Sequence, residues 1–307
     1  IHQDYLNFLL KFKEDWSNLK IAMDLSNGMA NLYAKEIFGA QPTYIFDTID
    51  GRFPNHEPNP LVAKNVVALQ ELVRKTGADI GVIYDGDADR VMFVDENARF
   101  ISPDLMIAVL GHYFLEKKGE KGIVLQDIRS SKAVGEYLTP MGAQMATWKV
   151  GRAFAANKLR ELNGIYGGEL AGHYYFRDFF FSDSGLLASM LILNVVAAMK
   201  KKGVSLSQLI AGIEKYKNSG EVNFKIENKK EAMDAVRDHF LAQEKPTAYM
   251  DFDGYRVEFP RWWFNVRPSN TEPYLRFICE ADSDELLADK LAQVKDILVN
   301  KFGGEQK

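Results

Sequence analysis

Two kinds of apolar segment alternate along the first part of the chain. Short runs that are apolar at nearly every position, such as Ile80–Tyr84, predict buried strands, and longer segments with apolar residues three and four apart predict helices. The predicted elements are strands 20–23, 43–46 and 80–84, and helices 29–38 and 61–75, the second ending at Gly77. Such alternation indicates βαβ units and a largely parallel sheet.

A second unit of the same kind is predicted to begin near Ser102-Pro103. Its predicted elements are strands 122–125, 143–147 and 165–166, and helices 104–117, 153–162 and 184–200, with a further helix after Arg129-Ser130-Ser131. Both units therefore have the α/β pattern, in which ligand sites lie beyond the carboxyl ends of strands.

After Ser219-Gly220 the predicted strands follow one another directly, which is typical of α+β domains. The predicted strands are 221–226, a strand near Tyr249, 255–259, 263–266 and 275–279, and the helices are 229–241 and 285–299. The expected fold is α/β, with two consecutive βαβ-type mixed-sheet domains followed by a C-terminal α+β domain. We expect these domains at 1–101, 102–218 and 219–307.

The composition excludes several classes of protein. The chain of 307 residues is 47% hydrophobic and 26% charged, as in ordinary globular proteins of two or three domains. A net charge of −4 without a Lys/Arg run gives no reason to expect a nucleic-acid partner, and no signal peptide or long apolar span indicates a membrane partner. The single cysteine, Cys279, lies in an apolar strand, so we expect a core residue and a chain suited to the reducing cytoplasm.

The hexapeptide Asp85-Gly86-Asp87-Ala88-Asp89-Arg90 stands between two apolar runs, 80–84 and Val91–Val94. Three carboxylates at alternate positions need a positive partner, and their oxygens suit a hard divalent cation, Mg²⁺ before softer metals. The guanidinium of Arg90 adds a fork suited to a phosphate. The hexapeptide therefore predicts a metal site that handles phosphate.

Two other interpretations share this acidic spacing. An EF-hand loop needs Gly at its sixth position, where this chain has Arg90, and it needs helices on both sides, so this interpretation fails. A solvated acidic turn between two strands stays open, because Asp and Gly favour turns in any context.

The heptapeptide Arg267–Pro273 joins two predicted strands of the last domain. Its guanidinium, hydroxyls, amide and backbone N–H groups can converge on a phosphate dianion, and its prolines limit the freedom of the loop. A rigid hairpin connection is the alternative interpretation.

Glycines and polar groups also meet in the segment Gly167–His173. The glycines allow a ligand to approach the backbone, Glu169 can accept hydrogen bonds from sugar hydroxyls, and His173 could orient Glu169 or a phosphate. A glycine-rich turn with a satisfied histidine is the alternative. Arg129 and Arg152 precede predicted helices, whose N-termini favour anions, although either fits a plain surface arginine.

Together these loops resemble those of the α-D-phosphohexomutase superfamily, the phosphoglucomutase and phosphomannomutase enzymes, along nearly the whole chain. Segment 85–90 resembles the family's metal-binding loop, 168–173 its sugar-recognition loop, and 267–273 its phosphate-binding loop, in the same order and with fitting separations. Arg129 falls where the family commonly has Lys, and Arg152 where many members have His after Gly. The resemblance implies that both contact the sugar or its phosphate.

Three departures from the family pattern matter. The family has four domains, and its first carries a phosphorylated serine in a Ser-His-Asn-Pro-type loop that this sequence lacks, so the resemblance covers domains two to four. Ala171 stands where many members have Ser, which removes one hydroxyl contact to the sugar. The stretches 174–179 and 182–185 look closest to bacterial phosphomannomutase-like members, which favours mannose as the sugar.

The resemblance implies an intramolecular phosphotransferase that interconverts hexose 1-phosphate and hexose 6-phosphate, of mannose and/or glucose, through hexose 1,6-bisphosphate. The implied site residues are Asp85, Asp87 and Asp89 for Mg²⁺, Arg90, Arg129 and Arg152 as catalytic groups, and Glu169, His173, Arg267, Ser269, Asn270 and Thr271 for the substrate. No side chain is a convincing nucleophile, and the chain starts inside a predicted helix at Ile1. We therefore expect a fragment that lacks the N-terminal phosphoserine domain of its parent and is inactive alone.

Two rival functions belong to other classes. A non-catalytic module that binds sugar phosphates without turnover would keep the same loops. A metal-dependent phosphatase with Asp85 as nucleophile would need a Thr or Ser two residues beyond a catalytic Asp pair, which Ala88 and Asp89 do not supply.

Overall fold

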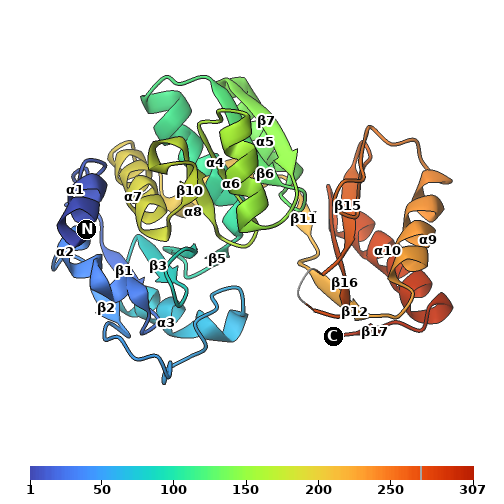
Figure 1. Ribbon diagram of the computed structural model, residues 1–307, viewed down its shortest axis with the longest axis horizontal. Coiled ribbons are helices and arrows are strands. Elements are labelled where there is room, and N and C mark those ends of the chain that lie inside the picture. The colour runs from blue at the N-terminus through green and yellow to red at the C-terminus, as the bar shows by residue number, and fades with distance from the viewer. Residues whose placement is uncertain (270–271) are drawn as a thin grey trace. The chain divides into compact units, whose positions relative to one another are not determined.

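The computed structural model describes residues 1–269 and 272–307. It divides into two compact units, the larger formed by residues 1–147 and 151–214 and the smaller by residues 148–150 and 215–307. Figure 1 labels many of the helices and strands of both units. The larger unit contains two five-stranded sheets, and the smaller contains one sheet.

The first sheet of the larger unit has the strand order β2-β1-β3-β4-β5. Its strands are β1 (Ile21–Asp24), β2 (Thr43–Ile45), β3 (Ile80–Tyr84), β4 (Val91–Asp95) and β5 (Phe100–Ile101). Strand β1 is parallel to β2 and β3, whereas β3, β4 and β5 are antiparallel neighbours. The sheet is mixed, and the expectation of a largely parallel sheet is wrong for its β3–β5 half, because the turn 85–90 folds β4 straight back on β3.

The structure corrects both of the helices that the sequence predicts between β1 and β3. The helical segments of this part are α1 (His2–Leu10), α2 (Ala34–Phe38), α3 (Val67–Thr76) and two 3₁₀ turns, η1 (Met29–Leu32) and η2 (Ala63–Asn65). The predicted helix 29–38 is therefore wrong as a single helix: Tyr33, with φ −128°, interrupts it. The predicted helix 61–75 is shorter, because Asn65 Nδ2 donates to the carbonyl of Asn59 and holds the preceding segment as a loop. The α3 helix ends as predicted at Gly77, whose φ of +61° suits glycine.

The second sheet of the larger unit has the order β10-β9-β8-β6-β7. Its strands are β6 (Gly122–Asp127), β7 (Ala143–Trp148), β8 (Tyr166–Gly168), β9 (Tyr174–Phe176) and β10 (Ser182–Asp183). The accompanying helices are α4 (Pro103–Gly111), α5 (Lys132–Leu138), α6 (Arg152–Glu161), α7 (Gly185–Lys201) and α8 (Leu206–Ile213), with the π-helix η3 (His112–Lys117) and the 3₁₀ turns η4 (Thr139–Met141) and η5 (Arg177–Phe179). The sequence interpretation missed β9 and β10, which are too short for a periodic pattern. It also missed α8, although the capping box formed by Ser205 and Gln208 indicates the start of a helix there.

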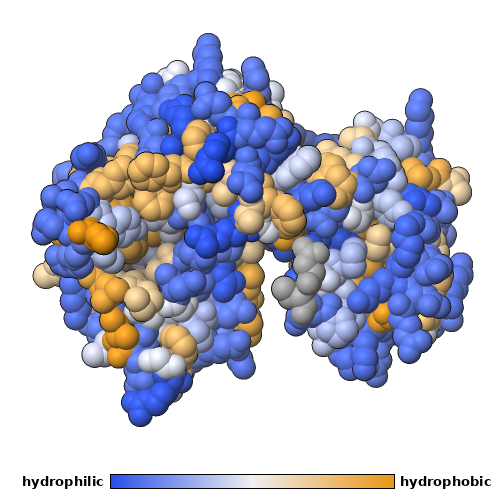
Figure 2. Space-filling view, viewed as in Figure 1, coloured by the Kyte–Doolittle hydropathy of each residue, from blue (hydrophilic) through white to orange (hydrophobic). Residues whose placement is uncertain are grey.

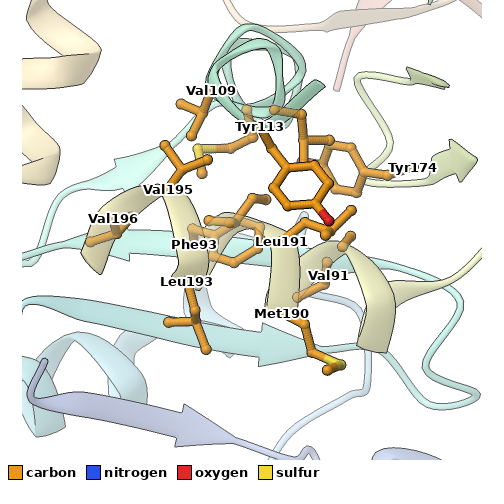
Figure 3. Close-up of a cluster of buried hydrophobic side chains, with 14 of the residues drawn as sticks. Val91, Phe93, Val109, Tyr113, Tyr174, Met190, Leu191, Leu193, Val195 and Val196 are labelled. Carbon is orange, nitrogen blue, oxygen red and sulfur yellow. The ribbon is translucent and has the colours of Figure 1, made fainter. Parts of the chain in front are cut away.

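One hydrophobic core joins the two sheets of the larger unit. Helix α7 contacts both β4 of the first sheet and α4 of the second. Figure 3 shows this contact, with Val91 and Phe93 of β4 on one side of the α7 side chains and Val109 of α4 on another. Because these side chains are buried together, the loops that leave the two sheets are held in fixed positions relative to each other.

The smaller unit confirms the predicted α+β pattern. Its antiparallel sheet has the order β13-β14-β15-β16-β12-β17, with β11 paired to β16. The strands are β11 (Lys217–Asn218), β12 (Val222–Lys225), β13 (Ala248–Met250), β14 (Tyr255–Glu258), β15 (Trp262–Pro268), β16 (Tyr274–Ala281) and β17 (Glu305–Gln306), and the helical segments are α9 (Lys229–Leu241), α10 (Asp284–Lys295) and η6 (Asp296–Lys301). Cys279 is fully buried in this unit's core, which raises the pKa of its thiol to about 12 and confirms its interpretation as a core residue.

Most of the surface seen in Figure 2 is hydrophilic, with apolar residues in smaller patches. Among the helices of residues 1–269 and 272–307, none combines the length and the apolar character needed to cross a lipid bilayer.

Candidate active site

The acidic loop 85–90 is a tight connection between β3 and β4, whose end residues Tyr84 and Val91 are paired. Ala88 has φ +64°, a left-handed conformation that is uncommon for a residue other than glycine. In this conformation Asp85, Asp87 and Asp89 each offer one carboxylate oxygen within 4.8 Å of the others. The loop therefore gathers three hard oxygen donors, as its sequence predicts.

The buried carboxyl of this loop is Asp85. Arg90 Nε lies 2.7 Å from Asp85 Oδ2, and the Arg90 backbone N–H donates to Oδ1 at 3.1 Å. Burial raises the pKa of Asp85 to about 6, against the opposing effect of Arg90 and with a contribution from the charge of Asp89. Burial also raises the pKa of Asp89. Burial thus disfavours the charged forms of these two carboxyls, a divalent cation among them would favour those forms, and the residues present fit Mg²⁺.

Two glycines from other segments let the backbone approach the acidic loop. The Met29 N–H donates to the carbonyl of Gly86 at 2.9 Å, and a Cβ on Gly28 would lie only 2.6 Å from that oxygen. The Gly185 N–H donates to the carbonyl of Ala88 at 3.3 Å, and a Cβ on Gly185 would lie 2.7 Å from it. The loop is therefore fixed from both sheets of the larger unit.

The segment Gly168–His173, between β8 and β9, lies directly beside the acidic loop. Arg90 and His173 form an isolated antiparallel bridge, and the Val91 N–H donates to the Gly172 carbonyl at 3.1 Å. Gly172 has φ +88°, and a Cβ there would lie 2.7 Å from the methyl group of Met92. Two loops about 80 residues apart in sequence thus form one site.

Glu169 is buried, and its two carboxylate oxygens already have partners. The Gly151 N–H donates to Oε1 and the Tyr175 hydroxyl to Oε2, each at 2.7 Å. Burial, with the charge of Asp127, raises the pKa of Glu169. The predicted contact between Glu169 and sugar hydroxyls stays a prediction, and it would require one of these hydrogen bonds to be exchanged.

Asp183 of β10 connects two of the predicted site residues, and the sequence interpretation assigned it no role. His173 Nδ1 and Arg152 Nε both lie 2.8 Å from its carboxylate, and both are within 3.8 Å of Asp89. Burial favours neutral His173, but the hydrogen bond to Asp183 and the charges of Glu169 and Asp89 outweigh it and raise the pKa of His173. Burial favours a neutral carboxyl at Asp183 as well, yet its bonds to His173 and Arg152 lower its pKa.

The ligating atoms of Asp89, His173 and Asp183 also lie within 4.8 Å of one another. A second cation site is nevertheless disfavoured here, because the guanidinium of Arg152 already supplies the positive charge between Asp89 and Asp183. This cluster is better suited to offering hydrogen-bond donors to a ligand than to holding a metal ion.

Arg129 is buried rather than exposed. Its Nη2 lies 2.7 Å from Asp127 Oδ2, and the same oxygen accepts the Leu170 backbone N–H at 2.8 Å. Burial would raise the pKa of Asp127, but the charge and hydrogen bonds of Arg129 lower it. Arg129 therefore supports the backbone of the Gly168–His173 loop through Asp127, and its predicted contact with the substrate stays a prediction.

In the smaller unit, Arg267 of β15 has the features of an anion-binding group. Its side chain is only 3% exposed, its Nε lies 3.3 Å from Asp253 Oδ1, and its buried Nη2 has no hydrogen-bond partner in residues 1–269 and 272–307. Ser269 Oγ accepts the Glu272 N–H at 3.2 Å, and the predicted residues Asn270 and Thr271 lie outside the described residues. Beside Pro273, a hollow of about 830 Å³ is lined partly by Lys225 and Lys229.

Family comparisons match this arrangement along almost the whole chain. Residues 3–98, 102–216 and 221–297 match the phosphoglucomutase/phosphomannomutase models for alpha/beta/alpha domain II, alpha/beta/alpha domain III and the C-terminal domain.

Individual relatives agree with these family matches. The chain is 34% identical, over 97% of its length, to a phosphomannomutase of Methanocaldococcus jannaschii, of which it covers 65%. It is 36% identical over 94% of its length to a protein of Xanthomonas campestris pv. campestris named "phosphohexose mutases", of which it covers 64%. A solved phosphoglucomutase/phosphomannomutase family protein from Burkholderia thailandensis superimposes with a TM-score of 0.84 at 26% identity, over 97% of this chain and 64% of that one. The chain thus spans just under two thirds of the length of these proteins.

Proposed function

The chain belongs to the phosphoglucomutase/phosphomannomutase family, and on that premise we propose that it supplies the metal-, sugar- and phosphate-binding parts of a phosphohexomutase. The enzyme would interconvert hexose 1-phosphate and hexose 6-phosphate through hexose 1,6-bisphosphate. The observation that supports this best is the hydrogen bond from Val91 to Gly172, which joins the acidic loop and the Gly168–His173 loop into one site.

The proposed reaction moves a phosphoryl group from a phosphoserine to the free hydroxyl of the sugar phosphate. The bisphosphate then turns round in the site and returns its other phosphate to the serine. Mg²⁺ bound by Asp85, Asp87 and Asp89 would offset negative charge on the phosphoryl group in transfer. Arg90 holds Asp85 in place.

The remaining residues of this chain would hold the sugar phosphate. His173 and Arg152 present donors beside Asp89. Arg267, with Ser269, Asn270 and Thr271 of the same loop, would bind the phosphate that is not being transferred, because Arg267 Nη2 is a charged donor without a hydrogen-bond partner among the described residues. Arg129 and Glu169 would act mainly by fixing the Gly168–His173 loop and the Gly151 turn.

We propose mannose and/or glucose as the sugar. The name of the Methanocaldococcus jannaschii relative supports mannose, and that of the Xanthomonas campestris relative supports hexoses more broadly. Ala171, which has no hydroxyl to offer, fits a site that distinguishes its sugars loosely.

We also propose that a phosphoserine domain of the same parent completes the site. The chain spans about 65% of its Methanocaldococcus jannaschii relative, and its sequence contains no Ser-His-Asn-Pro-type loop. The single buried cysteine supports a location in the reducing cytoplasm.

Mg²⁺ is expected to bind this chain weakly and in a pH-dependent way. Three carboxylates without a phosphoserine oxygen should give a Kd of about 1 mM near neutral pH. Because the pKa of Asp85 is raised to about 6, its carboxyl takes up a proton as the pH drops through that value, and the affinity for the metal should fall over the same range. Isothermal titration calorimetry at several pH values measures this. Absence of binding at millimolar Mg²⁺, in a parent protein that contains the serine domain, would rule out the metal assignment.

A further inference from the structure

We propose that Asp183 is a positioning residue whose single carboxylate directs both His173 and Arg152 toward the sugar phosphate. This inference rests on the proposed function for the identity of the ligand. The observation behind it is that the side chains of His173 and Arg152, from different segments, share this one buried carboxylate.

The backbone around Asp183 is held firmly. In the β10–β9 pair Asp183 lies opposite Tyr175, and the next residue, Ser184, donates its N–H to the Tyr174 carbonyl at 3.2 Å. The Ser184 hydroxyl then caps α7 by accepting the Leu187 N–H. Since its side chain is only 1% exposed, Asp183 cannot itself reach a ligand in solution and acts through its neighbours.

The contact with His173 determines which ring nitrogen is available. His173 Nδ1 lies 2.8 Å from Asp183 Oδ2, and a carboxylate only accepts hydrogen bonds, so the hydrogen is assigned to Nδ1. Among the described residues, the one hydrogen bond of the His173 side chain is this contact at Nδ1, so Nε2 is left for a ligand. The ring also stacks on Tyr175, with centroids 6.2 Å apart, so Nε2 is held in one direction.

The contact with Arg152 likewise holds one nitrogen of the side chain and leaves its other nitrogens for a ligand. Its Nε is 2.8 Å from Asp183 Oδ1 and 3.0 Å from Oδ2, while neither Nη takes a partner in residues 1–269 and 272–307. The side chain is 58% exposed. Because Asp183 holds Nε, the two Nη groups of Arg152 are left for an anion. Paired guanidinium N–H groups of this kind bind the oxygens of a phosphate.

An asparagine at position 183 could not serve both neighbours. Its amide has one oxygen, which the Arg152 Nε–H needs, because Arg152 can only donate. The amide NH₂ would then face His173 Nδ1, which would have to accept, and the ring hydrogen would move to Nε2. Because asparagine has nearly the shape of aspartate, the substitution tests which atoms donate and accept the hydrogen bonds of residue 183 and leaves the packing unchanged. The same reasoning applies to the aspartate of the Ser-His-Asp triad.

The test combines histidine NMR with ligand binding in this chain. Long-range ¹H–¹⁵N spectra of the ¹⁵N-histidine-labelled chain, recorded at about pH 9, report which nitrogen carries the hydrogen, and His173→Gln assigns the signal. We expect Nδ1–H in the original chain and Nε2–H in Asp183→Asn. In calorimetry with glucose 1,6-bisphosphate and MgCl₂, Asp183→Asn should bind about 10- to 100-fold more weakly.

Asp178→Asn is the matched control, since Asp178 lies nearby in η5 and pairs with Lys118 instead of the site residues. It should change neither the tautomer nor the affinity. An unchanged tautomer in a folded Asp183→Asn chain, or a changed tautomer with unchanged affinity, overturns the positioning role. If the original chain binds no bisphosphate, the proposed function fails, and the tautomer result alone then decides whether Asp183 directs His173.

Discussion

Replacing Asp87 with Asn is expected to lower mutase turnover by about a thousandfold in the parent polypeptide that includes the phosphoserine domain. Asp87 is the exposed member of the three carboxylates, so its loss should remove a metal ligand without disturbing the fold. Asp85 is less suitable for this test, because its carboxylate also holds Arg90. The measurement is the steady-state rate at saturating sugar phosphate and about 1 mM Mg²⁺.

The control for this prediction is again Asp178→Asn, which makes the same chemical change outside the site. Its turnover should equal that of the original protein. Full turnover by Asp87→Asn under these conditions would show that the acidic loop is a solvated turn rather than a metal site, which is the alternative that its sequence left open.

Arg267→Lys is expected to raise KM for the sugar phosphate by about 10- to 100-fold, with a smaller change in kcat. A lysine keeps one positive charge beside Asp253 but loses the fork whose Nη2 has no hydrogen-bond partner among the described residues. The variant should therefore bind the phosphate more weakly, and its melting temperature should stay close to that of the original protein.

Arg261→Lys provides the matched comparison for Arg267→Lys. Arg261 immediately precedes β15, at the other end from Arg267, and pairs with Asp282 at the surface. The KM of the Arg261→Lys variant for the sugar phosphate should equal that of the original protein. Equal KM values for the two variants would remove Arg267 from the phosphate site.

The clustering of the three carboxylates in the acidic loop could be predicted from the sequence because it depends on neighbouring residues. The alternate spacing of the three aspartates, between two strands that pair with each other, brings their carboxylate oxygens together. The phosphate-binding role of Arg267 stays a prediction, which the sequence suggests because polar residues follow Arg267 directly.

What the sequence could not reveal were pairings across distant segments. Asp183 is one aspartate in a short strand, and only the tertiary fold brings it to His173 and Arg152. The burial of Arg129 against Asp127 also depends on the fold, because the same spacing would suit a surface arginine. The bond from the Met29 N–H to the carbonyl of Gly86, more than 50 residues away in the sequence, likewise depends on the tertiary fold.

The most direct test of the central claim is a mutase assay of the complete parent gene product. Mannose 1-phosphate and glucose 1-phosphate are supplied separately, with Mg²⁺ and a trace of hexose 1,6-bisphosphate to phosphorylate the serine, and formation of the 6-phosphate is measured. We predict turnover of at least one sugar, and its loss when the protein is truncated to begin at Ile1. No turnover by a well-folded parent, together with micromolar binding of the sugar phosphate, would contradict the account and identify a sugar-phosphate-binding module instead.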